Sequence, residues 1–206
     1  MKIGVVPKII EKYSKQYEYT IEFKLIEFLK KVFKNSEIYF LTEKKKIKLN
    51  LIVLSGGNDI YKVSKLQKDK LRYEIDKYYI NQYLGKIPII GICYGAQILA
   101  FKSKNILYRS NLHVGSHLLY FSSFLNKKKI NVLSHHKYVF KNLLNFEIFA
   151  KADDGSIEGF FEKRRRFCGI IWHPERQKNI KLHKKLFIKI YEIINFSLRK
   201  RKKIKN

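Results

Sequence analysis

The 206-residue sequence predicts an α/β protein with a mostly parallel sheet, helices on both of its faces and a small antiparallel extension in the second half. The first half alternates short apolar runs with amphipathic stretches, which indicates parallel strands joined by right-handed crossover helices. The run 49–54 is apolar apart from Asn50, so we expect this strand to be buried on both faces. The second half instead alternates short β-like runs with turns such as Asp153-Asp154-Gly155.

The elements follow from the spacing of apolar residues along the chain. The first strand is Lys2–Val6, closed by Pro7. The helices expected after it cover 21–33, 64–84 and 180–196, which have helical spacing of apolar residues, and 94–101, which is mostly apolar. The remaining strands expected in the first half are 38–41, 49–54 and 87–92. Those expected in the second half are 118–121, 130–133, 146–150, 157–161 and 168–172.

Length and composition are typical of one globular domain, which we place at 1–198, followed by a basic tail at 199–206. Two cysteines, Cys93 and Cys168, are too few for a disulfide scaffold. The N-terminus lacks the apolar run of a secretory signal, and no stretch reaches the length of a membrane span. We therefore expect a cytoplasmic protein with no membrane partner.

The net charge of +27 is extreme, and it raises the possibility of nucleic acid as a partner. Most of the positive charge is lysine, and the basic clusters 44–46, 127–129, 164–166 and 199–203 are scattered over turns and the terminus. A biased composition and solubility explain this distribution without a nucleic-acid site, so we do not expect nucleic acid as a partner. An anionic small-molecule substrate would also be attracted to such a surface.

The most informative motif is Gly91-Ile92-Cys93-Tyr94-Gly95, which lies between an apolar strand and an apolar helix. A nucleophile on such a sharp strand-to-helix turn needs small neighbours, and the following helix favours its thiolate form. A buried cysteine after a strand is also a common packing residue. We take Cys93 as the candidate nucleophile, whereas Cys168 and Trp172 are interpreted as packing residues.

A thiol nucleophile needs a base, and the base needs a group that orients it. The segment His173-Pro174-Glu175 follows the late apolar strand, and strand ends meet at one edge of an open α/β sheet. We expect His173 to take the proton of the thiol and Glu175 to hold the imidazole. Cys93, His173 and Glu175 are therefore the candidate catalytic residues.

Acyl transfer also needs donors for a developing oxyanion. The backbone N–H groups of Gly57 and Tyr94 are the candidates, because Tyr94 follows the nucleophile directly and Gly56-Gly57 follows another strand. Gly56 would let a substrate approach the bare backbone closely. From the glycine pair alone, a simple strand-to-helix turn remains an equal alternative.

Together, the motif 91–97 and His173-Pro174-Glu175 resemble the class I glutamine amidotransferase family, whose triad is Cys-His-Glu. The resemblance covers about 2–176. It implies a flavodoxin-like sheet and cleavage of glutamine or another γ-glutamyl amide through a γ-glutamyl thioester. It also implies that Gln97 helps to hold the glutamyl group and that Gly57 is an oxyanion donor.

The finer pattern resembles the γ-glutamyl hydrolase branch, peptidase family C26. The carrying segments are 55–59, 113–117, 132–136, 154–160 and 172–176. By this resemblance, Ser134 and His136 lie beside the substrate, while His113 and His117 are either part of the site or surface residues at strand ends. Tyr94 departs from the Arg that is common in this branch, and Leu133 departs from its Asn.

The predicted function is cysteine-dependent hydrolysis of a γ-glutamyl amide, with the small-molecule amide or glutamine as substrate and glutamate as a product. We expect no metal and no organic cofactor. One alternative is a glutaminase subunit that supplies ammonia to a partner synthetase, since the chain has no P-loop of its own. Another is a non-catalytic nucleic-acid-binding protein, for which affinity would fall steeply with salt and Cys93→Ala would have no effect.

Overall fold

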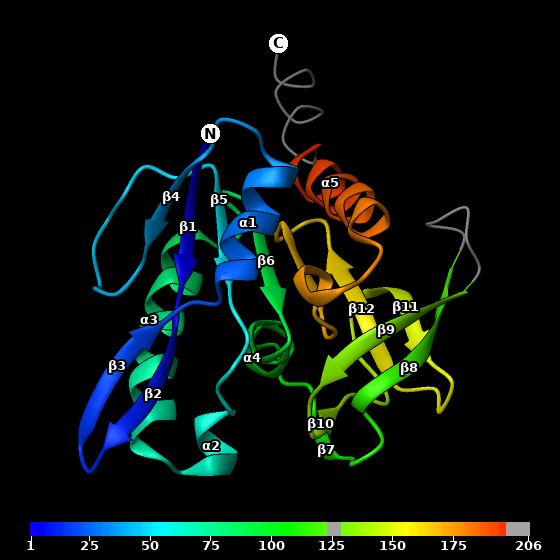
Figure 1. Ribbon diagram of the computed structural model, residues 1–206, viewed down its shortest axis with the longest axis horizontal. Coiled ribbons are helices and arrows are strands. Elements are labelled where there is room, and N and C mark those ends of the chain that lie inside the picture. Colours follow the sequence, from blue (N-terminus) through cyan, green and yellow to red (C-terminus); the bar gives the residue numbers. More distant parts are fainter. Residues whose placement is uncertain (123–128, 197–206) are drawn as a thin grey trace.

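The computed structural model describes residues 1–122 and 129–196, and a mixed nine-stranded sheet forms its centre (Figure 1). The order across the sheet is β4-β1-β5-β6-β13-β12-β11-β8-β9. The strands are β1 (Lys2–Val6), β4 (Glu37–Phe40), β5 (Leu51–Leu54), β6 (Ile89–Ile92), β8 (Val114–Phe121), β9 (Lys129–His135), β11 (Glu147–Ala152), β12 (Ile157–Glu162) and β13 (Phe167–Ile170). The basic tail 199–206 and two residues of the cluster 127–129 lie outside the described residues.

The sheet has a parallel part and an antiparallel part. Strands β4, β1, β5, β6 and β13 are parallel to one another. From β13 onward each neighbouring pair is antiparallel, in the order β13-β12-β11-β8-β9. The predicted fold class, including the antiparallel extension, is therefore confirmed. Two minor pairs stand outside this sheet: β2 (Lys8–Tyr13) with β3 (Gln16–Thr20), and β7 (Tyr108–Arg109) with β10 (Tyr138–Val139).

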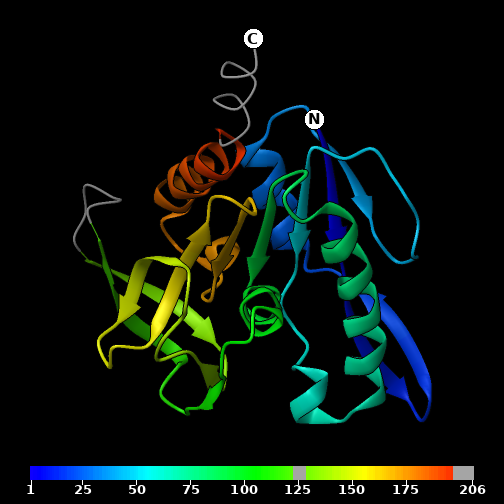
Figure 2. The ribbon, with the colours of Figure 1, turned by 180° about the vertical axis from the view of Figure 1, so that it is seen from behind.

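Helices cover both faces of the sheet. On one face, α1 (Phe23–Val32) and α5 (Ile180–Phe196) pack against the strands and against each other, with the rings of Phe28 and Phe187 edge-to-face at 5.3 Å. On the other face lie α3 (Gln67–Tyr83) and α4 (Tyr94–Lys102), as the reverse view shows (Figure 2). The short helices α2 (Tyr61–Ser64) and η1 (Pro174–Arg176) lie in connections.

The hairpin β2–β3 was not predicted from the sequence. It begins directly after Pro7, and most of its side chains are exposed, so it carries no clear apolar alternation. Only Ile9 is anchored in the core, where its backbone N–H and C=O both bond to the side chain of Asn58, each at 3.0 Å. An exposed hairpin held by one polar side chain leaves little trace in a hydrophobicity pattern.

Helix α3 buries charge as well as apolar residues. Ile75 and Tyr79 are buried as predicted, but so are Arg72 and Asp76, which form an ion pair at 2.9 Å. The guanidinium also donates to the carbonyl of Pro7 at 2.6 Å. No sequence pattern indicated this burial, because a polar i, i+4 pair on a charged helix usually lies in solvent.

Arg72 connects α3 with the chain that leaves β5. Its guanidinium donates to the carbonyl of Ser55 at 3.0 Å and to the hydroxyl of the same residue at 3.3 Å. Ser55 directly precedes Gly56-Gly57, so this buried guanidinium fixes the start of that segment. Among the described residues, no helix is long and apolar enough to cross a membrane.

Candidate active site

Three strands of the parallel part end at the same edge and bring the predicted residues together. Gly56-Gly57 follows β5, Cys93 follows β6, and His173 follows β13. Gly57, Cys93 and His173 border a pocket of about 260 Å³. Its lining residues are Gly57, Asn58, Asp59, Lys68, Cys93, Gln97, His135, His136, Lys137, Tyr138, His173 and Arg176.

Cys93 occupies a strained turn between β6 and α4. Its backbone has φ 52° and ψ −111°, a positive-φ conformation that is rare for a residue with a side chain. Its backbone N–H donates to the carbonyl of Ile170 at 2.8 Å, which ties the turn to β13. A Cβ on Gly91 would overlap the backbone of Gly95, and a Cβ on Gly95 would overlap the carbonyl of Leu54. The glycines on either side of the cysteine are thus required by packing.

His173 and Glu175 form a buried pair beside the thiol. Nδ1 of His173 lies 2.7 Å from Oε1 of Glu175, and both side chains are at most 5% exposed. Burial lowers the pKa of His173, but the charge of the Cys93 thiolate, a hydrogen bond to that sulfur and the contact with Glu175 outweigh it and raise this pKa to about 10. The arrangement therefore favours an imidazolium at His173, next to Cys93, at neutral pH.

Gly56 lies close to both Cys93 and His173. A Cβ at this position would lie 3.0 Å from Cε1 of His173 and 3.1 Å from Cβ of Cys93. Gly57 has a φ of +102° and lines the pocket. Since β5 and β6 are adjacent parallel strands, Gly57 and Tyr94 follow neighbouring strand ends, and Tyr94 begins the helix directly after the thiol.

The residues expected at the substrate are divided between the pocket and the interior. Gln97 and His136 line the pocket, and each bonds to the carbonyl of Tyr138, from Nε2 of Gln97 at 3.0 Å and from Nδ1 of His136 at 3.1 Å. Ser134 is not among the lining residues. Its side chain is 1% exposed and points inward from β9.

The two departures from the hydrolase-branch pattern lie outside the pocket lining. The side chain of Tyr94 is fully buried, and its ring lies 5.0 Å from the guanidinium carbon of Arg72. Burial, and then the charge of Asp76, raise the pKa of Tyr94 well above its usual value. Leu133 is 44% exposed. Its contact with the site is made by its backbone carbonyl, which accepts hydrogen bonds from the side chain of Gln177 and the backbone N–H of His173. Neither Tyr94 nor Leu133 is among the residues that line the pocket.

The cations of the pocket were not predicted from the sequence. Lys68, Lys137 and Arg176 all line it, against one acidic residue, Asp59. Arg176 is held by an ion pair with Glu22, in which Nε lies 2.8 Å from Oε2. Arg176 follows the His-Pro-Glu segment directly and could have been proposed on that ground, whereas the lysines belong to a background of 44 basic residues that hides them.

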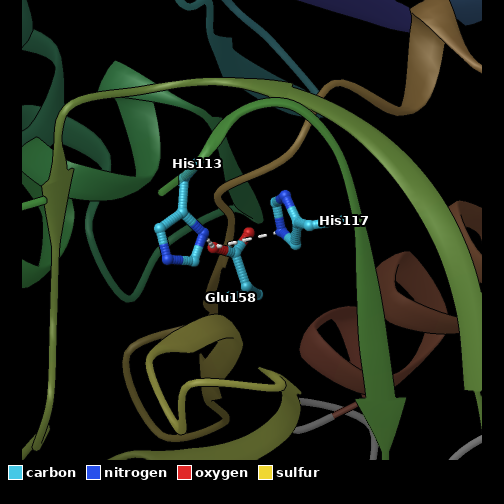
Figure 3. Close-up of side chains that lie close together, drawn as sticks. All are labelled: His113, His117 and Glu158. Carbon is cyan, nitrogen blue, oxygen red and sulfur yellow. Dashed lines mark ion pairs between the residues drawn. The ribbon is translucent and has the colours of Figure 1, made fainter. Parts of the chain in front are cut away.

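A cluster of histidines lies behind one wall of the pocket. His113 precedes β8, His117 lies on β8, and both surround Glu158 of β12 (Figure 3). His136, which lines the pocket, contacts the same carboxylate at 3.1 Å. The side chains of His113 and His117 are 2% and 8% exposed, so the surface alternative for these two residues is wrong.

Comparison with known proteins agrees with this architecture. The model of the family described as glutamine amidotransferase class-I matches residues 9–193. The chain belongs to this family. It is accordingly an amidase-type enzyme that acts on C–N bonds, as the sequence predicted.

Curated relatives include a hydrolase and several glutamine-hydrolysing synthases. A γ-glutamyl-CDP-amidate hydrolase of Campylobacter jejuni is 35% identical over 151 residues, which are 70% of this chain and 72% of that protein. The glutamine-hydrolysing GMP synthase of Brachyspira hyodysenteriae is 27% identical over 163 residues, which are 75% of this chain but only 29% of the synthase. In Methanococcus aeolicus, one glutamine-hydrolysing GMP synthase subunit is 31% identical over 131 residues, 60% of this chain and 63% of that protein.

Solved structures support the fold. A GMP synthase subunit from Thermoplasma acidophilum superposes with a TM-score of 0.71 at 20% identity and 98% coverage of both chains. A glutamine amidotransferase from Thermotoga maritima superposes with a TM-score of 0.66 at 16% identity, covering 94% of this chain and 97% of that one. At these identities, the likeness shows the fold alone.

Proposed function

We propose that this enzyme hydrolyses a γ-glutamyl amide through a γ-glutamyl thioester on Cys93, with His173 as acid and base and Glu175 as its positioning partner. The observation that carries the proposal is the strained turn at Cys93, which faces a buried His173–Glu175 pair across a pocket. The first step is attack of the thiolate on the γ-carbonyl carbon. The backbone amides of Gly57 and Tyr94 would donate to the oxyanion that develops there.

Proton transfer follows from the charge state of His173. Because its pKa lies near 10, His173 holds a proton at neutral pH and can give it to the leaving amine as the C–N bond breaks. The resulting neutral imidazole then takes a proton from water, and this water attacks the thioester carbonyl. Glutamate leaves, and the thiolate–imidazolium pair is restored. His173 supplies the proton that the leaving amine takes, and the attacking water replaces it.

The charge of the pocket favours an anionic leaving group. Lys68, Lys137 and Arg176 line a space of about 260 Å³ beside the thiol. Glutamine has a neutral leaving group and would use these cations little, whereas a γ-glutamyl amide of a phosphate compound would bring negative charge to them. We therefore propose the γ-glutamyl amidate of a nucleoside diphosphate, as in the name of the Campylobacter relative, over glutamine itself.

A substrate panel tests this proposal. Glutamate release would be measured with glutamine, γ-glutamyl-γ-aminobutyrate and γ-glutamyl phosphoramidates, including a γ-glutamyl-CDP-amidate. We expect the phosphoramidates to have the highest kcat/KM, and Cys93→Ser to abolish turnover. Cys168→Ser is the matched control, because that buried cysteine lies on β13 away from the pocket lining and should leave the rates intact. Equal rates for wild type and Cys93→Ser on every substrate would reject the enzymatic mechanism.

A glutaminase subunit that supplies ammonia to a partner synthetase is the second candidate. It is favoured by the similarity to the GMP synthase subunit of Methanococcus aeolicus. This candidate predicts that the chain alone releases little glutamate from any substrate, and that an added synthetase raises glutamine hydrolysis many-fold. Full-rate hydrolysis of one γ-glutamyl amide by the chain alone would reject it.

A further inference from the structure

The cluster behind the pocket wall brings three potential metal ligands, His113, His117 and Glu158, close to one another, and a fourth, His136, contacts the same carboxylate. Nδ1 of His113, Nε2 of His117 and Nε2 of His136 lie 3.2, 3.7 and 3.1 Å from Oε1 of Glu158. Ligand atoms of His113, His117 and Glu158 all lie within 4.8 Å of one another. In a tetrahedral zinc site with ligands at 2.0–2.1 Å, neighbouring ligand atoms are about 3.3 Å apart. The three distances from the histidine nitrogens to Oε1 of Glu158 are close to that value.

The ligand atoms of this cluster are buried without hydrogen bonds. Nδ1 of His113, both ring nitrogens of His117, Nε2 of His136 and both carboxylate oxygens of Glu158 have no hydrogen-bond partner among the described residues. Glu158 is 0% exposed. So many buried polar atoms without partners are costly unless something between them satisfies their lone pairs. A cation at the centre would satisfy the inner nitrogen of each imidazole and the carboxylate of Glu158 together.

Outer contacts orient two of the imidazoles for this role. Nε2 of His113 lies 3.0 Å from Oδ2 of Asp154 and 3.1 Å from the hydroxyl of Ser156. Nδ1 of His136 lies 3.1 Å from the carbonyl of Tyr138. In each ring, the nitrogen that faces away from the centre can donate its proton outward, which leaves the inner nitrogen as a lone pair. Carboxylate or carbonyl support of this kind is typical of metal-bound histidine.

We propose that His113, His117, His136 and Glu158 bind one divalent transition-metal ion, Zn²⁺ by ligand type. Three imidazoles and one carboxylate suit zinc, whereas calcium and magnesium prefer oxygen ligands alone. The site is separate from the Cys93–His173 pair, so it does not depend on the hydrolytic proposal. His136 belongs to both the site and the pocket lining, which places the ion directly behind the wall that a substrate would contact.

The ion would cross-link the strands β8, β9 and β12 of the antiparallel extension. Its ligands come from the start of β8, from β8 itself, from the end of β9 and from β12. Without a metal, the cluster has to balance the buried carboxylate with a proton on one of three histidines. A metal-binding cluster and a cluster balanced by a proton differ in a measurable way, since only the metal-binding cluster takes up Zn²⁺ at a defined stoichiometry.

Metal binding by the full chain tests the proposal. Protein without an affinity tag would be stripped with a chelator, titrated with ZnCl₂ and, in parallel, with CoCl₂, whose four-coordinate complexes absorb in the visible range. We expect one Zn²⁺ per chain, a higher melting temperature with Zn²⁺, and the visible spectrum of four-coordinate Co²⁺. His117→Gln and Glu158→Gln should each weaken binding ~100-fold or more, because each removes a ligand. His183→Gln, a change at a buried histidine outside the cluster, should bind as wild type does.

Two further variants keep the outcome decisive. Asp154→Asn leaves all four ligands in place and removes only the outer carboxylate, so it should fold and bind zinc about 10- to 100-fold more weakly. Cys93→Ser should bind zinc as wild type does. The proposal is overturned if folded wild type binds no stoichiometric Zn²⁺. It is also overturned if binding is lost in Cys93→Ser and kept in Glu158→Gln, because the ion would then sit on the thiolate.

Discussion

Gly56→Ala is a sensitive test of the geometry at the nucleophile. The added Cβ would lie 3.0 Å from Cε1 of His173 and 3.1 Å from Cβ of Cys93, whereas ordinary contact begins at 3.4 Å. The methyl group therefore intrudes by about 0.4 Å on one side and about 0.3 Å on the other. Gly56 itself has no unusual φ, so the substitution adds contact without backbone strain.

The expected cost follows from this displacement. A misplacement of about 1 Å between reacting groups can lower the rate ~100-fold, so a few tenths of an ångström should lower kcat/KM ~10-fold, or about 1.4 kcal/mol of activation free energy. We expect the loss mainly in kcat, since Gly56 is not among the pocket-lining residues. Glutamate release with the best substrate of the panel, followed over a range of concentrations, gives both constants.

Gly85→Ala is the matched control for this substitution. A Cβ there meets nothing within 4 Å, although the φ of +77° makes the position strained. It should lose some free energy of unfolding in urea and keep its kcat/KM. If Gly56→Ala keeps kcat/KM within a factor of about two, or if Gly85→Ala loses as much activity, the close approach at Gly56 does not control the geometry of the triad.

Three further substitutions probe charge. Glu175→Gln removes a carboxylate that supports the raised pKa of His173, so this pKa should fall and alkylation of the nucleophilic thiol by iodoacetamide at pH 7 should slow ~10-fold. Asp76→Asn leaves the guanidinium of Arg72 buried without its partner and should lower the free energy of unfolding in urea by about 3–5 kcal/mol. Burial lowers the pKa of His183 to about 4, so its folded form is neutral and its stabilising effect is lost as the pH falls from about 6.5 toward 4. Stability curves of wild type and His183→Gln should converge over that range by at most about 3 kcal/mol.

Each charge prediction has a result that contradicts it. An alkylation profile of Glu175→Gln that overlays that of wild type would mean that the carboxylate does not act on the imidazole. A loss of less than about 1 kcal/mol in Asp76→Asn would mean that water reaches the guanidinium. A constant difference between wild type and His183→Gln from pH 7 to pH 4 would show that this ring is not kept neutral by burial.

The parallel half of the fold was predictable because its signals are local. Strands such as β5 are short apolar runs, and the glycines around Cys93 are required by contacts between neighbouring backbones. The hairpin β2–β3 escaped prediction because its side chains are mostly exposed. The burial of Arg72 escaped because it depends on carbonyls at Pro7 and Ser55, which are distant in sequence.

The candidate site was predictable where a short sequence motif at a strand end suggests a single chemical role. Cys93 and the His173–Glu175 pair stand at strand ends, and the sheet brings strand ends together. The environment of Glu158 could not be predicted, because its histidine neighbours come from two separate segments, 113–117 and 136, that meet only through antiparallel pairing. Lys68 and Lys137 could not be distinguished in the sequence from many other lysines, because only the fold places these two at the pocket.

The backbone of Leu133 has a consequence for how this enzyme can vary. Its N–H donates to Oε1 of Gln177 at 2.9 Å, and its carbonyl accepts from Nε2 of the same side chain at 2.9 Å and from the backbone N–H of His173 at 3.4 Å. Strand β9 thus contacts the backbone of His173 through a carbonyl group, which every amino acid possesses. Position 133 can therefore accept almost any side chain and keep this bond to His173, whereas Leu133→Pro would remove the N–H that donates to Gln177.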